Sequence, residues 1–131
     1  MTTTVRPFLM FQNGEAEAAM RFYVSLFDDG DIHELTRFAP GAPGEGKVQR
    51  ASFSVGGQMV MCTDSYVRHA FDFTPSSSLF VECGDAAELE RLAAALGEGG
   101  QVLMPLGDYG FSRRFTWLND RFGVSWQLNL A

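Results

Sequence analysis

The segment Phe11-Gln-Asn-Gly-Glu-Ala-Glu-Ala-Ala-Met-Arg-Phe22 returns in altered form as Val81-Glu-Cys-Gly-Asp-Ala-Ala-Glu-Leu-Glu-Arg-Leu92. The two stretches lie 70 residues apart (81 − 11 = 70), and each runs through a glycine into an apolar pattern with helical spacing. The apolar positions are Ala19, Phe22, Tyr23 and Leu26 in the first copy and Leu89, Leu92, Ala93 and Leu96 in the second. This i, i+3, i+4, i+7 spacing predicts an amphipathic helix in each half of the chain.

Short segments of β type surround both predicted helices, with one before each helix and three after it. The expected strands are Arg6–Phe11, Ile32–Phe38, Val48–Val55 and Gln58–Thr63, then Ser77–Val81, Gln101–Met104, Phe111–Leu118 and Ser125–Leu130. Asp85, with Glu88 three residues later, is typical of a helix start, and Gly97 is expected to end that helix in a left-handed conformation.

The sequence therefore predicts an α+β fold of two βαβββ modules in tandem, whose curled mixed sheets surround a cup. Residues 1–131 would form a single domain. Module 1 covers about 5–64, a linker about 65–76, and module 2 about 77–131.

Composition and charge narrow the function classes. Apolar residues make up 46% of the 131 residues and charged residues 20%, which is typical of a globular chain. Sixteen acidic against ten basic residues give a net charge of −6, which argues against nucleic-acid binding. No apolar run is long enough to span a membrane, and the N-terminus lacks a signal-peptide pattern. We expect a cytoplasmic protein in which Cys62 and Cys83 are free thiols.

Several segments carry a resemblance to a known superfamily. They are Pro7-Phe-Leu-Met-Phe11, Phe22-Tyr-Val-Ser-Leu-Phe27, Phe71-Asp-Phe-Thr-Pro75 and Asp120-Arg-Phe-Gly-Val-Ser-Trp-Gln127. Through these segments the chain resembles the vicinal oxygen chelate superfamily, which includes glyoxalase I, extradiol dioxygenases and bleomycin-resistance proteins. The resemblance covers nearly the whole chain. Within this superfamily, the chain is similar to the PhnB-like branch, often labelled 3-demethylubiquinone-9 3-methyltransferase. The resemblance implies a glyoxalase-like fold and a homodimer, in which halves or chains pair to complete the cups.

The resemblance also implies four metal-ligand positions. They fall near Arg6, near Met61 (or Thr63 in an alternative register), near Ser78 and at Gln127. Arginine has no acceptor atom, and only the last of the four offers an oxygen that commonly serves as a ligand. We therefore expect no metal and no cofactor. The two histidines, His33 and His69, stand outside any metal-binding spacing, although ligands from a second chain could complete a site.

Strand alternation predicts which side chains line the cup. They are Phe8, Met10, Met59, Met61, Ser78, Phe80, Ser125, Gln127 and Asn129. Arg113, at the rim, could hold a carboxylate or phosphonate. The alternative is that these side chains close on one another as core. No Ser-His-Asp or Cys-His set is predicted, because neither histidine has a motif neighbour.

Three functions remain open at this point. The first is a protein that binds a small organic molecule in an apolar cup without a metal. The second is a metal-dependent enzyme of the glyoxalase or dioxygenase type. The third is a protein whose paired surface is its function, with the cup filled. The methyltransferase of the family label is disfavoured, because no strand, glycine-rich turn and helix follow one another as a usual S-adenosylmethionine site requires. Whether any catalysis occurs is left open.

Overall fold

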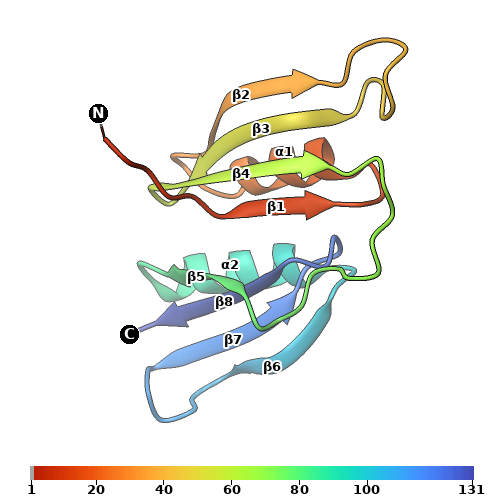
Figure 1. Cartoon of the computed structure of the whole chain (residues 1–131). Helices are drawn as coiled ribbons and strands as arrows, with labels where there is room; N and C mark the ends of the chain where they lie inside the picture. Colours follow the sequence, from red (N-terminus) through yellow and green to blue (C-terminus); the bar gives the residue numbers. More distant parts are fainter. Residues whose placement is uncertain (1) are drawn as a thin grey trace. The chain divides into compact units, whose positions relative to one another are not determined.

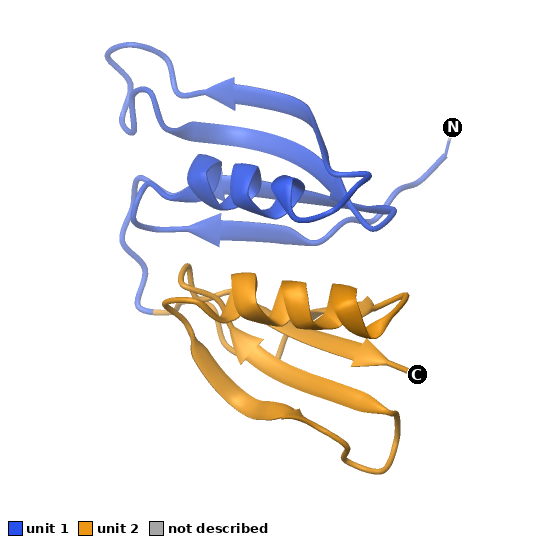
Figure 2. Ribbon diagram, turned by 180° about the vertical axis from the view of Figure 1, so that it is seen from behind, with its two compact units in different colours: residues 1–70 blue, residues 71–131 orange. Residues whose placement is uncertain are grey.

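The computed structural model describes residues 2–131 and divides into two compact units, one ending at Ala70 and the other beginning at Phe71 (Figure 2). The division falls inside the segment 65–76 that was expected to be a linker. The first part of that segment is tied to the first unit. The His69 N–H donates to Oε1 of Gln12 at 2.7 Å, and Arg68 donates to Oδ1 of Asn13 at 2.9 Å.

The first unit is a βαβββ module with a four-stranded sheet (Figure 1). Its elements are β1 (Phe8–Phe11), α1 (Ala16–Ser25), β2 (Asp31–Arg37), β3 (Val48–Val55) and β4 (Gln58–Asp64). The strand order is β1-β4-β3-β2, with β1 parallel to β4 and the other pairs antiparallel. The helix α1 covers one face, where the fully buried Tyr23 packs against Phe53 with ring centroids 6.1 Å apart.

The second unit repeats this module. Its elements are β5 (Ser78–Glu82), α2 (Ala86–Gly97), β6 (Gln101–Gly107), β7 (Arg114–Asn119) and β8 (Ser125–Leu130). The strand order is β5-β8-β7-β6, with β5 parallel to β8. The helix α2 buries Leu89, Leu92 and Leu96 against the sheet. The tandem βαβββ architecture predicted from the sequence is therefore confirmed, and each sheet is open rather than closed into a barrel.

Buried carboxylates hold the ends of elements together in both units. In the first, Asp64 at the end of β4 accepts hydrogen bonds from the backbone N–H groups of Ala16 and Val48, both at 2.9 Å. In the second, Asp120 accepts from the indole N–H of Trp126 at 2.9 Å and from backbone N–H groups of the β7–β8 turn. Both carboxylates thus satisfy the requirement that a buried charge be hydrogen-bonded.

Several element boundaries differ from the sequence predictions. The strands β2, β4 and β5 differ by one residue at one or both ends, and β6 runs three residues further, to Gly107 rather than Met104. The strand β1 begins at Phe8 rather than Arg6, because Pro7 has no N–H to donate to the ladder. The strand β7 begins at Arg114 rather than Phe111, because the chain still bends through residues 110–113, with φ of +93° at Gly110. Gly97 ends α2, but the left-handed residue is Gly99, with φ +73°.

The helix start at Asp85 is as predicted, since its side chain accepts from the Glu88 N–H at 2.8 Å. Among residues 2–131, neither helix has the length and apolar character needed to cross a membrane.

Candidate functional site

The face of the first sheet that α1 leaves uncovered carries four of the residues predicted to line the cup. These are Phe8 and Met10 on β1 and Met59 and Met61 on β4. The parallel register sets Phe8 opposite Met61. The Phe8 side chain is 54% exposed, whereas the three methionines are half-buried. We call this surface the helix-free face of the first sheet.

The corresponding helix-free face of the second sheet is built from three cross-strand rows. They are Ser78–Ser125–Asn119, Phe80–Gln127–Trp117 and Glu82–Asn129–Phe115, each running from β5 through β8 to β7. Five of these nine residues are the remaining predicted lining residues from β5 and β8. Hydrogen bonds join neighbouring rows: Gln127 Nε2 donates to Ser78 Oγ at 2.7 Å, and the Trp117 indole N–H donates to Ser125 Oγ at 2.8 Å.

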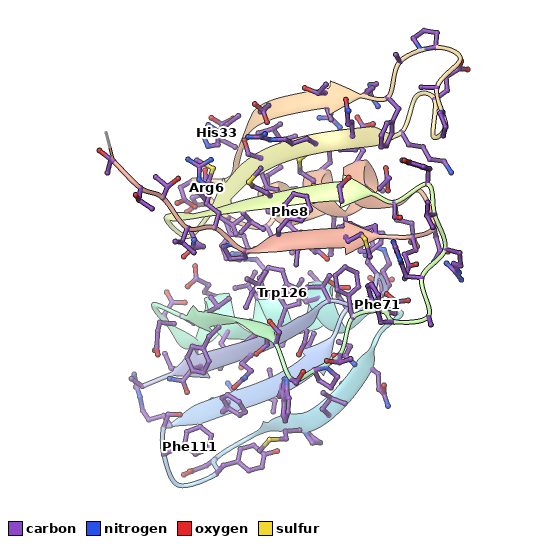
Figure 3. All side chains as sticks on the ribbon, in the orientation of Figure 1. Arg6, Phe8, His33, Phe71, Phe111 and Trp126 are labelled. Carbon is purple, nitrogen blue, oxygen red and sulfur yellow. The ribbon has the colours of Figure 1, made fainter. Side chains whose placement is uncertain are left out.

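An aromatic cluster stands at one end of this second face. It consists of Phe80, Tyr109, Phe111 and Phe115. Phe115 is buried, and its ring centroid lies 5.0 Å from that of Phe111, 6.0 Å from that of Tyr109 and 6.4 Å from that of Phe80. The other three rings are 41–62% exposed. Figure 3 shows Phe111 on the connection between β6 and β7. The loop therefore adds two rings to the face that strand alternation alone did not predict.

Arg113 lies in that same connection and not on β7 as the sequence suggested. Its Nε donates to the backbone carbonyl of Ala131 at 2.6 Å, and the side chain is exposed. Arg114, the first residue of β7, points to the helix-covered face and pairs with Glu90 of α2 at 2.6 Å. Arg113 is therefore held by a main-chain carbonyl rather than by a strand, and its role as a rim residue stays a prediction.

The four positions of the superfamily's metal ligands do not form a metal site here. Arg6 precedes β1, and the β1 residue opposite Met61 is Phe8. The 70-residue repeat relates Phe8 to Ser78 and Met10 to Phe80. Met10 pairs with Thr63 in the first sheet and Phe80 pairs with Gln127 in the second, so Thr63 is the counterpart of Gln127. Within residues 2–131, no group of three or more His, Cys, Asp or Glu side chains could hold a metal ion. The residues present do not fit the divalent ion of the superfamily.

A histidine–serine contact on the first sheet was missed by sequence reasoning. Nε2 of His33 lies 2.8 Å from Oγ of Ser54, on β2 and β3 respectively. A register shift at His33 brings the two together, and no local spacing signals it. In the described part of the chain, the other ring nitrogen has no hydrogen-bond partner. The pair therefore lacks the third group that orients the base in a catalytic triad.

Neither cysteine of the chain has a reactive thiol. Burial, with the Asp64 carboxylate as a smaller cause, raises the pKa of Cys62 to about 12. Burial, followed by the Glu88 carboxylate, raises the pKa of Cys83 to about 11. Both cysteines are free thiols and are held in the unreactive protonated form. At the start of each helix a carboxylate of the chain itself accepts from a backbone N–H group, Asp64 at α1 and Asp85 at α2.

Comparison with known families shows to which family the chain belongs. The family model for 3-demethylubiquinone-9 3-methyltransferase matches residues 3–129. The chain belongs to the PhnB-like 3-demethylubiquinone-9 3-methyltransferase family. A PhnB protein from Bacillus cereus that carries the same methyltransferase label is 50% identical, with a TM-score of 0.94, and the match covers 98% of this chain and 100% of that one.

Other solved structures extend this PhnB-like relationship. A protein from Pseudomonas aeruginosa is 30% identical, with a TM-score of 0.85 and coverage of 98% of both chains. A glyoxylase/bleomycin resistance protein/dioxygenase domain from Frankia is 15% identical, with a TM-score of 0.67 over 100% of this chain and 93% of that one. The last shows the fold alone and confirms the glyoxalase-like class of this PhnB-like chain. No curated protein matches it.

Proposed function

We propose that this PhnB-like protein binds a small organic molecule on the helix-free face of its second sheet, without the superfamily's metal. The observation that carries the proposal is the aromatic cluster beside a row of amide and hydroxyl groups. Phe80 is 52% exposed and Phe111 62% exposed, so both rings have apolar surface left to bury.

The polar groups on the same face suit a role in orienting a ligand. Small-molecule sites combine apolar walls with a few fixed polar groups. Gln127 is half-buried, and its Nε2 is already engaged by Ser78, which fixes the direction of its Oε1. We propose that this oxygen accepts a hydrogen bond from the ligand.

The metal-free part of the proposal rests on side-chain chemistry. Met61 and Phe8 offer no oxygen or nitrogen donor for a hard divalent ion. The neutral oxygens of Ser78 and Gln127 do not form a divalent-ion site by themselves. We therefore do not propose a metal-dependent reaction, and no residue of the site supports methyl transfer.

The chain's two tryptophans give a matched pair of reporters for this proposal. Trp117 lies on the helix-free face, whereas Trp126 is buried on the opposite face of the same sheet. We would record the two indole N–H resonances of chelator-treated, ¹⁵N-labelled protein during titration with indole, benzyl alcohol and 1-hexanol. The variant Trp117→Phe assigns the peaks.

The expected result is a saturable shift of the Trp117 resonance by at least one of the three molecules, with Trp126 little affected. Addition of Zn²⁺, Fe²⁺, Ni²⁺ or Mn²⁺ should not alter the binding. If none of the three molecules shifts the Trp117 indole resonance, or if the shift appears only after metal is added, the proposal is wrong.

The resemblance also implies a homodimer, and we keep this as a proposal. Light scattering at micromolar concentration should give about twice the chain mass of 14.4 kDa. A mass equal to that of one chain would contradict it.

A further inference from the structure

We propose that the ligand of this face is an organic cation, held by the aromatic cluster and by the carboxylate of Glu82. This inference rests on the proposed function and adds the chemical class of the ligand. The carrying observation is a carboxylate and several exposed rings side by side on one sheet face.

The sheet register places Glu82 next to the cluster. Glu82 follows Phe80 by two residues on the edge strand β5, so both side chains emerge from the same face. Across the sheet, Glu82 shares a row with Asn129 and Phe115. The Asn129 Nδ2 donates to Glu82 Oε2 at 3.2 Å, while its Oδ1 accepts from the Ser112 hydroxyl. This chain of hydrogen bonds holds the carboxylate beside the rings.

The carboxylate lacks a cationic partner within the described chain. None of the ion pairs between described residues includes Glu82, although the four pairs that do form engage other glutamates. Of the two arginines beside the cluster in sequence, Arg113 donates its Nε to the Ala131 carbonyl and forms no ion pair with Glu82. Arg114 is directed to the other face. A positively charged ligand would supply the missing partner.

The rings suit the same class of ligand. The faces of aromatic rings carry negative potential and attract cations, most strongly where water is partly excluded. Tyr109 and Phe111 are stacked, with an interplanar angle of 17°, and Phe111 meets the buried Phe115 at 73°. The exposed Phe80 adds a further ring next to Glu82. The net charge of −6 favours the approach of a cation over that of an anion.

Three molecules of the same shape separate charge from size. Choline, 3,3-dimethylbutan-1-ol and 3,3-dimethylbutanoate are a cation, a neutral molecule and an anion with matched branched heads. Each would be titrated into the full chain, with the Trp117 and Trp126 resonances as the readout. We expect choline to bind at least about fivefold more tightly than the neutral alcohol and the anion to bind most weakly.

Glu82→Gln should remove most of the preference for choline while leaving the affinity for the neutral alcohol unchanged, since the amide can still accept from Asn129. Glu98→Gln is the matched control, because it removes the same charge from an exposed residue of the same unit at the end of α2. It should retain the preference. Phe111→Leu should lower the affinity for choline more than it lowers the affinity for the neutral alcohol.

The outcomes distinguish this inference from the function on which it rests. Equal affinity for choline and the alcohol, or a preference that Glu82→Gln does not reduce, overturns the cation assignment and leaves the proposed binding function intact. Binding of indole without binding of any of the three matched molecules has the same consequence. Trp117 shifts that depend on protein concentration without any probe would indicate that a second copy covers the face, and would also overturn the cation assignment. If no molecule of either set binds, both proposals fall.

Discussion

Gln127 Nε2 donates a 2.7 Å hydrogen bond to Ser78 Oγ, and this contact joins two of the positions that hold metal ligands in metal-dependent members of the superfamily. Where those proteins need donors directed at an ion, these two side chains satisfy each other. The contact fixes two polar groups on the helix-free face of the second sheet, which is what the proposed metal-free binding requires.

Replacing Gln127 by Leu should separate stability from binding. The glutamine is half-buried and the Ser78 hydroxyl can bond to water instead, so the free energy of unfolding should change by no more than about 1 kcal/mol. Binding of polar aromatic molecules such as benzyl alcohol should weaken, because the fixed oxygen is lost. Urea unfolding and the Trp117 titration measure the two effects. A large loss of stability with unchanged binding would assign this residue to the core.

Removing the Asp64 carboxylate should destabilise the first unit. Asp64→Ala leaves the N–H groups of Ala16 and Val48 buried without acceptors, which should cost about 2–4 kcal/mol in the free energy of unfolding. The control is Asp28→Ala, an exposed residue, which should change stability by less than about 0.5 kcal/mol. Denaturant unfolding of both variants tests this, and equal effects would show that these hydrogen bonds contribute little.

The ion pairs of Glu17 should make stability depend on pH in the acid range. Hydrogen bonds from Arg37 and then from Arg21 lower the pKa of Glu17 from 4.5 to about 2. Because the folded pKa is depressed, the stabilisation is present above the ordinary pKa near 4.5. It is lost as the pH falls from there towards about 2.

The stability gap between wild type and Glu17→Gln should therefore be constant at neutral pH and shrink across that acid window. Denaturation midpoints measured at several pH values give the gap. In the Arg37→Gln background the main partner is absent, so the gap should be smaller and vary less with pH. A gap that stays constant down to about pH 2 would contradict the assigned ion pair.

The two cysteines should resist thiol reagents in the folded protein. With the pKa of Cys62 at about 12 and that of Cys83 at about 11, little thiolate exists near neutral pH, and both side chains are buried. A disulfide-exchange reagent should therefore label the native protein at least about tenfold more slowly than the denatured protein. Rapid labelling of either residue without unfolding would show that its surroundings open.

Much of the fold could be predicted because helices and strands leave periodic signals. The strand Val48–Val55 was predicted with its observed bounds, since most of its buried residues are apolar and Gly56-Gly57 supply the left-handed turn that follows, with φ of +55° and +80°. The repeat at 70 residues then indicated a second module. These features are local in sequence, so they can be recognised without knowledge of long-range contacts.

The candidate site was only partly predictable. Alternation correctly placed the predicted residues of β5 and β8 on one face of the sheet, but it placed Arg113 on a strand and said nothing of Tyr109. The loop of residues 108–113 has no period, and its fold depends on the left-handed Gly110 and on contacts with Phe115. The neighbours of Glu82 across the sheet follow from register, which one strand's sequence does not contain.

The most direct test of the central claim combines metal content with binding. Untagged protein would be dialysed against trace Zn²⁺, Fe²⁺, Ni²⁺ and Mn²⁺, analysed for each element, and titrated with indole before and after chelator treatment. We predict clearly substoichiometric metal and an unchanged, saturable shift of the Trp117 resonance. One metal ion per chain, together with loss of the indole response on chelation, would contradict metal-free binding on this face.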